Sequence, residues 1–378
     1  MPPPLTDELR DRLALTLVPG LGPKLTAAML ENFGSASAVR HAAFTELMQV
    51  PHVGEKLARQ FGGALAAIDV DAEIERLKRF NTHLLALNLP GYPAALATID
   101  DAPQLLYIRG EIKPEDANAV AIVGSRQCTP YGIRVTEKLA GGLARAGFTV
   151  VSGLARGIDG AAHQGALNGG GRTIAVLAGG LSNIYPPEHL ELSRSVEASG
   201  ALITETPMAM SPMRGMFHAR NRLISGLSRA VVVVEANERS GALITARHAG
   251  EQGRDLFALP ANVDSPSSAG SLKLIRDGAR VIRHLDDLLE DLKGIDIATS
   301  PQRNEPPSLF TDLPKVIEKP AGLDPLPSRV WDYLTEPKHI DDITREMEIS
   351  ISEISRLLMS LEIKKIVRRL PGNQYERR

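Results

Sequence analysis

Between about residues 82 and 284, short apolar runs alternate with helical stretches, and this alternation constrains the fold more than any other feature of the chain. The runs consist mostly of Val, Ile and Ala. Strands that are apolar throughout are buried on both faces, and helical connections keep successive strands parallel. The fold class that follows is α/β, a mostly parallel sheet with helices on both faces. Strands are predicted over 119–123, 148–151, 173–177, 201–204, 230–235 and 255–258, and helices over 132–146, 158–167, 188–198, 219–227 and 242–252.

Glycine-rich turns follow three of the predicted strands, at residues 124–126, 153–157 and 179–180. Backbone amides at such turns lie at helix N-termini, where they bind phosphate groups. Arg126 and Arg156 fall within these turns, and an arginine can hold a phosphate through two hydrogen bonds. Tight turns alone would explain the glycines but not the arginines. The pattern therefore indicates an anion site beyond the carboxyl ends of the strands.

A basic segment strengthens this interpretation. Residues 214–229 contain four arginines and no acidic residue, and the Arg-Asn-Arg triplet at 220–222 precedes a predicted strand. The Ser-Gly pair at 240–241 opens the next helix, and Phe217 could stack on a base. The residues predicted to contact phosphate or DNA are Gly124, Ser125, Arg126, Arg156, Arg214, Phe217, Arg220, Asn221, Arg222, Ser240 and Gly241.

The rest of the composition narrows the classes of function. The net charge is -2, so any signal for nucleic acid must come from a local patch. Cys128 is the only cysteine, which excludes a disulfide framework and a zinc finger. The sequence has no G-x-G-x-x-G after the first strand, no P-loop and no G-x-S-x-G elbow. We therefore predict a binding protein with no cofactor, no metal and no enzymatic activity.

Four titratable residues near the strand ends need a separate interpretation. Asp159 and His163 lie four positions apart and could form an acid/base pair, although a structural role is the commoner one. Glu205 and Glu235 are expected to be partners of the nearby arginines. The N-terminus lacks the features of a secretory signal and no apolar run reaches the roughly 18 residues of a membrane helix, so we expect a soluble, cytoplasmic protein.

The two ends of the chain predict further domains. Val-Pro-x-x-Gly-x-Lys occurs at 18–24 and again at 50–56, which indicates a helix-hairpin-helix domain over 1–75. Its hairpins could hold a phosphate or simply turn the chain. The main domain is expected over 76–294 and a linker over 295–326. Three helices and a hairpin with its turn at 371–372 predict a winged helix over 327–378, with contact to DNA or to protein left open.

Several motifs, in this order, resemble the bacterial DNA-processing protein A (DprA/Smf) family. They are Gly-Ser-Arg at 124–126, Gly-Leu-Ala-Arg-Gly-Ile-Asp at 153–159 with Ala-His at 162–163, Tyr-Pro at 185–186, Arg-Asn-Arg-Leu-Ile-Ser at 220–225, Glu-Ala at 235–236, Ser-Gly-Ala-Leu-Ile-Thr-Ala at 240–246, Gly-Arg at 253–254 and Leu-Pro at 259–260. The sequence departs from the family at Ala242, where serine is expected, and in the loop at 261–264. The N-terminal helical region and the C-terminal winged helix resemble those of three-domain members of the family.

The resemblance implies a Rossmann-like central domain that binds single-stranded DNA. Such proteins protect incoming DNA in natural transformation, help to load the RecA recombinase, form homodimers through the central domain and are not known as enzymes. The implied DNA pocket comprises Gly124, Ser125, Arg126, Arg214, Phe217, Arg220, Asn221 and Arg222.

Two other functions remain open from the residues. An N-glycosidic hydrolase acting on nucleoside monophosphates could use a similar phosphate site, with Glu205 or Glu235 as the catalytic residue. Alternatively, the winged helix could read duplex DNA while the central domain senses a nucleotide.

Overall fold

A computed structural model describes residues 5–292, 320, 324–334, 337–364, 366–370 and 373–377. The chain divides into two compact units, residues 1–310 and 311–378, which are described separately. Most of the predicted linker at 295–326 and the predicted hairpin turn at 371–372 lie outside the described residues.

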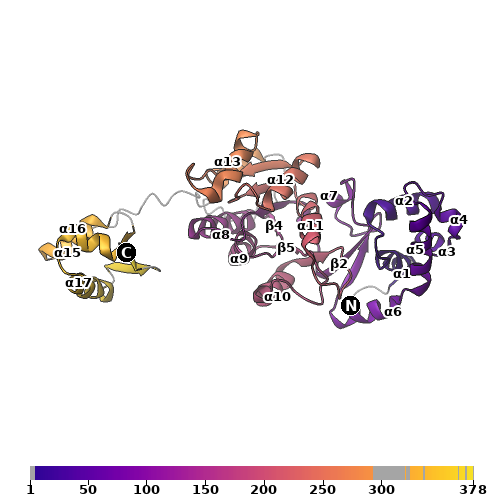
Figure 1. Cartoon of the computed structure of the whole chain (residues 1–378), viewed down its shortest axis with the longest axis horizontal. Helices are drawn as coiled ribbons and strands as arrows, with labels where there is room; N and C mark the ends of the chain where they lie inside the picture. Colours follow the sequence, from indigo (N-terminus) through magenta and orange to yellow (C-terminus); the bar gives the residue numbers. More distant parts are fainter. Residues whose placement is uncertain are drawn as a thin grey trace. The chain divides into compact units, whose positions relative to one another are not determined.

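A nine-stranded sheet forms the centre of the first unit, in the order β1-β2-β6-β5-β4-β3-β7-β8-β9 (Figure 1). The strands from β6 to β9 in this order are parallel, which confirms the predicted mostly parallel sheet. Their bounds are β3 (Ala119–Val123), β4 (Thr149–Ser152), β5 (Thr173–Val176), β6 (Ala201–Thr204), β7 (Ala230–Val233), β8 (Asp255–Ala258) and β9 (Arg280–Val281). Three strands were not predicted, β1 (His83–Ala86), β2 (Leu105–Gly110) and β9. Of these, β1 and β2 extend the sheet antiparallel beside β6.

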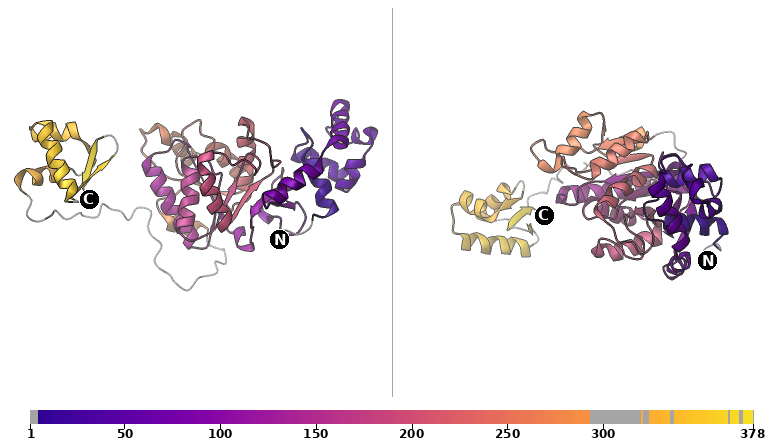
Figure 2. Two further views of the ribbon diagram at one scale, coloured as in Figure 1. Left: turned by 90° about the horizontal axis from the view of Figure 1, so that it is seen from below. Right: turned by 45° about the vertical axis from the view of Figure 1, so that its right-hand side comes forward.

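Helices cover both faces of the sheet because its central strands are buried throughout (Figure 2). One face packs against α11 (Arg214–Gly226) and α12 (Ala242–Glu251) through Val123, Val231 and Leu223. The other face packs against α8 (Pro130–Arg145), α9 (Ile158–Asn168) and α14 (Leu285–Asp291) through Ile122 and Leu139. The remaining helices of this part are α7 (Ala94–Ala97), α10 (Leu190–Ser199) and α13 (Ala269–Arg276), with 3-10 turns η1 (Pro114–Ala117), η2 (Pro187–His189) and η3 (Pro266–Ser268).

Six helices precede the sheet and confirm the helix-hairpin-helix prediction. They are α1 (Asp7–Thr16), α2 (Pro23–Phe33), α3 (Ala36–His41), α4 (Phe44–Leu47), α5 (Glu55–Ala67) and α6 (Val70–Arg79). The two repeated motifs end at the starts of α2 and α5, where Gly22 and Gly54 are the N-cap residues. Helices α1 and α6 pack against β2 through Leu13, Leu77 and Tyr107, so this helical region shares a core with the sheet.

Glu73 of α6 joins the helical region to the loop that precedes α11. Its side chain is buried, and Oε1 accepts a hydrogen bond from the backbone N–H of Met208 at 2.6 Å. The other oxygen, Oε2, pairs with Arg76 at 3.0 Å. We expect Glu73→Ala to destabilise the protein by about 1–3 kcal/mol, because it leaves a buried N–H unpaired. Chemical unfolding would measure this loss.

The matched control is Glu75→Ala on the same helix. Glu75 is exposed and pairs with exposed Lys78, so its removal should change the free energy of unfolding by less than about 1 kcal/mol. Equal losses in the two variants would contradict a special role for Glu73.

The second unit is a winged helix, as predicted. It comprises α15 (Pro325–Tyr333), β10 (Lys338–His339), α16 (Ile340–Met347), α17 (Ile351–Ile363), β11 (Val367–Leu370) and β12 (Gln374–Arg377). The strands form a small sheet in the order β10-β12-β11, and Val330, Ile343 and Leu358 lie at the core. Among the described residues, none of the helices combines the length and the apolar composition that crossing a lipid bilayer would require.

Candidate nucleic-acid interface

A large cavity, here called the main cavity, lies beyond the carboxyl ends of β3 and β7. The chain continues from β3 toward β6 on one side and from β7 toward β9 on the other, so the order of the sheet reverses there. Ligands of open α/β sheets bind at such reversal points. The cavity has an empty volume of about 1360 Å³, including space open to solvent. Its lining contains Gly124, Ser125, Arg126, Arg156, Arg214, Phe217, Arg220, Asn221, Ser240 and Gly241, which are all the predicted site residues except Arg222.

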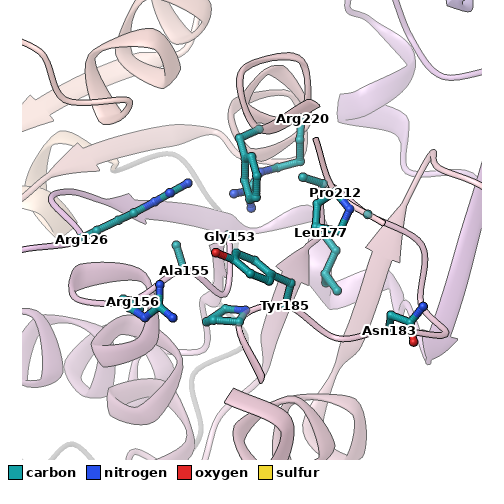
Figure 3. Close-up of a pocket in the computed structure, with 13 residues that line it drawn as sticks. Arg126, Gly153, Ala155, Arg156, Leu177, Asn183, Tyr185, Pro212 and Arg220 are labelled. Atoms are coloured by element: carbon teal, nitrogen blue, oxygen red, sulfur yellow. The ribbon is translucent and has the colours of Figure 1, made fainter. Parts of the chain in front are cut away.

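A smaller side cavity, whose empty volume of about 420 Å³ includes space open to solvent, adjoins the main one and shares Arg126, Ala155, Arg156, Phe217 and Arg220 with it. Its other walls are Gly153, Leu177, Ala178, Gly179, Asn183, Tyr185, Pro186 and Pro212 (Figure 3). The ring of Tyr185 meets Phe217 edge-on, with 5.8 Å between the ring centroids. Tyr185 was not among the predicted contacts. Two sequence signals pointed to it, the Tyr-Pro motif at 185–186 and its position shortly after the Gly179-Gly180 turn.

The turn after β3 presents Arg126 to both cavities. The Ser125 N–H donates to the Glu235 carbonyl at 2.7 Å, and the Ser125 carbonyl accepts from the Ile158 N–H at 3.2 Å. Gly124 permits this close approach, since a Cβ there would lie 2.6 Å from the Ile158 side chain. With the backbone fixed, the exposed Arg126 guanidinium lies over the Phe217 ring, 4.9 Å from its centroid. The arrangement places a cation against the face of an aromatic ring.

Arg220 is the buried cation of the site, with only 5% of its surface exposed. Its Nη1 donates to the Val176 carbonyl, while its Nε has no hydrogen-bond partner among the described residues. Burial lowers the pKa of Arg220 to about 10, although the nearby Asp159 charge opposes this shift. The side chain is therefore still charged at neutral pH. A cation away from bulk water attracts a phosphate more strongly than an exposed one.

The other wall of the main cavity is the start of α12. The Asn221 amide nitrogen donates to the Gly241 carbonyl at 3.1 Å, which ties α11 to this turn. The Ser240 hydroxyl oxygen accepts from the Ala242 N–H at 3.3 Å. Gly241 is the N-cap of α12, and the first three amides of the helix already donate to Ser240 or Gly241. This wall therefore offers an anion the positive end of the helix dipole rather than free N–H groups.

Helix α11 begins at Arg214, five residues earlier than predicted. The helical geometry determines which of its basic residues face the cavities. Phe217 and Arg220 are three positions apart and share one face of the helix. Arg222 is two positions from Arg220 and points elsewhere, because each residue turns the helix by about 100°. Its side chain, 6% exposed, pairs with Glu205 at 2.5 Å and Asp101 at 3.3 Å. The structure therefore places Arg222 outside both cavities.

The two glutamates at strand ends have different partners. Glu205 pairs with Arg222, as expected. The expectation of an arginine partner was wrong for Glu235, whose carboxylate accepts from the N–H of Thr129 at 2.9 Å and from its hydroxyl at 2.5 Å. Glu235 thus supports the N-cap of α8, since Thr129 occupies that position. Neither glutamate lines either cavity, so neither is placed to act as the catalytic residue of a hydrolase.

His163 and Asp159 hold the turn between β4 and α9. His163 Nδ1 lies 2.7 Å from the Thr173 hydroxyl oxygen, and its Nε2 accepts from the Leu154 N–H at 3.3 Å. Burial lowers the pKa of His163 to about 3, so the ring is neutral. Asp159 is buried beside Arg220 and bonds to the backbone of Ala155 and the side chain of Ser152.

The low pKa of His163 predicts acid sensitivity. In the unfolded chain the ring binds a proton below about pH 6.5, whereas the folded protein excludes it down to about pH 3. Stability should therefore fall as the pH drops below about 6.5, by about 1.4 kcal/mol per pH unit. Between pH 6.5 and 5 the loss is about 2 kcal/mol. Urea unfolding of wild type and His163→Asn at both pH values would measure it.

In that experiment His163→Asn should be less stable at pH 7 but lose less stability on acidification. The control is His41→Asn, because His41 is exposed on the short helix α3. If wild type and His163→Asn lost stability equally between the two pH values, the ring would not be neutral in the folded protein.

Comparison with known proteins gives matches along most of the chain. Residues 83–293 match the family model described as DNA recombination-mediator protein A. Residues 317–373 match the DprA winged helix domain, and residues 12–60 match a SAM-like helix-hairpin-helix tandem. The Protein Smf of Synechocystis is 36% identical over 389 residues, covering 97% of this chain and 98% of that protein.

Two solved structures are also similar. The DNA processing protein A of Streptococcus pneumoniae matches with a TM-score of 0.67 and 32% identity, covering 77% of this chain and 99% of that one. The DNA processing protein A of Helicobacter pylori, whose structure was described for its single-stranded DNA binding mode, has a TM-score of 0.52 and 33% identity. That match covers 56% of this chain and 96% of the other. Three family models match this chain, and a relative aligns with it over nearly its whole length. Because the fold agrees as well, this chain belongs to the DNA recombination-mediator protein A family, as the resemblance of its motifs indicated.

Proposed function

We propose that this protein binds single-stranded DNA without sequence preference, at the main cavity of its central sheet. The observation that carries the proposal is the Arg126 guanidinium over the Phe217 ring, beside the buried Arg220. The two arginines supply contacts for successive phosphates, which carry no sequence information, and the positive end of α12 favours an anion beside them.

A preference for single strands follows from Phe217. Its ring is partly buried in the wall shared by the two cavities, so only a base that has left a stack can reach its face. Stacking on an aromatic ring tolerates any base, and it favours splayed single strands over a duplex. The related Helicobacter pylori protein, described as a single-stranded DNA binder, supports the same assignment here.

Membership of the family supports the wider role. We propose that the protein processes incoming DNA in natural transformation, protects it and helps to load the RecA recombinase in the cytoplasm. We also propose a homodimer through the central domain, because two such sites would make the second engagement intramolecular and raise avidity. The role is one of binding, since Asp159, the acidic residue in the lining of the main cavity, is buried in structural contacts.

Fluorescence polarisation of labelled oligo-dT, with unlabelled oligo-dT or duplex as competitor, tests the proposal. Binding should be displaced by single strands far better than by duplex and should weaken steeply from about 50 to about 200 mM salt. Equal displacement by duplex DNA would contradict the preference for single strands. Incubation with AMP followed by chromatography tests the hydrolase alternative, for which the appearance of adenine would be the decisive result.

A further inference from the structure

Arg156, which also lines the main cavity, already has an anionic partner within the chain. Arg156 Nε donates to Glu188 Oε1, and the Tyr185 side chain bonds to the same guanidinium. The Arg156 and Glu188 side chains are 51% and 47% exposed. The pair lies at the edge of both cavities, because Arg156 lines each of them.

The turn that carries Arg156 is firmly held. The N–H of Leu154, a residue with a positive φ of 55°, donates to the buried His163 ring. The N–H of Gly160 donates to the Ala155 carbonyl at 3.0 Å. Gly157 has a positive φ of 74°, and a Cβ there would lie 2.3 Å from the Ser125 carbonyl oxygen. The backbone around Arg156 therefore has one position relative to the Arg126 turn.

The segment that carries Glu188 is held against this same turn. His189, its neighbour in η2, places Nδ1 2.9 Å from the Leu154 carbonyl oxygen. Its ring also lies against Gly160, where a Cβ would be 2.8 Å from the imidazole. Both partners of the ion pair are thus fixed by separate contacts to the turn between β4 and α9. Glu188 is set opposite Arg156 by the fold.

We propose that Glu188 is a built-in competitor of DNA, which occupies Arg156 until a phosphate takes its place. The inference rests on the proposed function and adds a residue that sets the affinity of the same site. A carboxylate oxygen binds a guanidinium in the same way as a phosphate oxygen. Its negative charge also repels an approaching phosphate. The exchange is feasible because an exposed ion pair contributes little stability.

A double-mutant cycle with Glu188→Gln and Arg156→Ala tests the proposal by oligo-dT affinity at low salt. Glu188→Gln should bind about two- to fivefold more tightly than wild type, the range expected for release of one exposed pair. In the Arg156→Ala background the same change should bring little gain. Correspondingly, Arg156→Ala should weaken binding more in the Glu188→Gln protein than in wild type.

Glu191→Gln is the matched control, since Glu191 is the next acidic residue, is 80% exposed and pairs with Arg194 away from the cavities. It should leave the affinity unchanged, which separates a local exchange from a change in net charge. Unchanged or weaker binding by Glu188→Gln would overturn the proposal, as would an equal gain with Arg156 absent. If wild type did not bind oligo-dT at all, the proposed function and this inference would both fail. If it bound through Arg126 but ignored Glu188, only the inference would fail.

Discussion

Arg126→Ala is expected to weaken oligo-dT binding by about ten- to a hundredfold at low salt, the loss that follows from removing one charge-assisted contact to a phosphate together with a cation over an aromatic ring. Arg126 is exposed and borders both cavities, so DNA entering either one meets it. The slope of log affinity against log salt should fall by about one, because one fewer phosphate is neutralised. Fluorescence polarisation at several salt concentrations measures both quantities.

Arg134→Ala is the matched control for this change. Arg134 is an exposed arginine on α8 and lies over the ring of Tyr131 at 5.7 Å, so it repeats the cation and ring contact outside both cavities. Its replacement should leave the affinity and the salt slope as in wild type. Both variants should unfold like wild type, because neither arginine is buried. Arg126→Ala binding as tightly as wild type at low salt would remove the main cavity as the DNA site.

The sequence was sufficient to predict the centre of the fold because the apolar runs were unambiguous. Strands β3 and β6 have the predicted bounds, since buried parallel strands are short, nearly continuous apolar runs and both runs are distinct from their flanking residues. The location of the site followed from the same topology. The carboxyl ends of parallel strands meet at one edge, so turns at 124–126 and 153–157 must lie together although they are distant in sequence.

The side-chain directions could not be predicted in the same way. Treating residues 220–222 as one basic cluster ignored the helical rotation that sends Arg222 to Glu205 and Asp101. The early start of α11 was hidden by Gly215, a poor helix former in its first turn. Tyr185 and Glu188 were not predicted as site residues because they reach the site from a long connection, several residues beyond the Gly179-Gly180 turn that follows β5.

Gly153→Ala is expected to lower DNA affinity about as much as Arg220→Ala does, although Gly153 itself has no group that could bind DNA. A Cβ at this position would lie 2.0 Å from Arg220 Nη1 and 2.5 Å from Cζ. The Arg220 guanidinium would have to leave its buried place, and the Val176 carbonyl would lose its partner. We therefore also expect a loss of stability of about 1–3 kcal/mol, the cost of an unsatisfied buried polar group.

The Gly153→Ala, Arg220→Ala double variant distinguishes this mechanism from a general disturbance of the turn. Both single changes act through one guanidinium, so their effects on oligo-dT affinity should not add. Gly215→Ala is the control, since a Cβ at Gly215 meets nothing within 4 Å and should leave binding unchanged. Wild-type affinity in Gly153→Ala would mean that DNA does not need the buried position of Arg220. Additive losses would mean that the turn after β4 contributes to binding by a route other than Arg220.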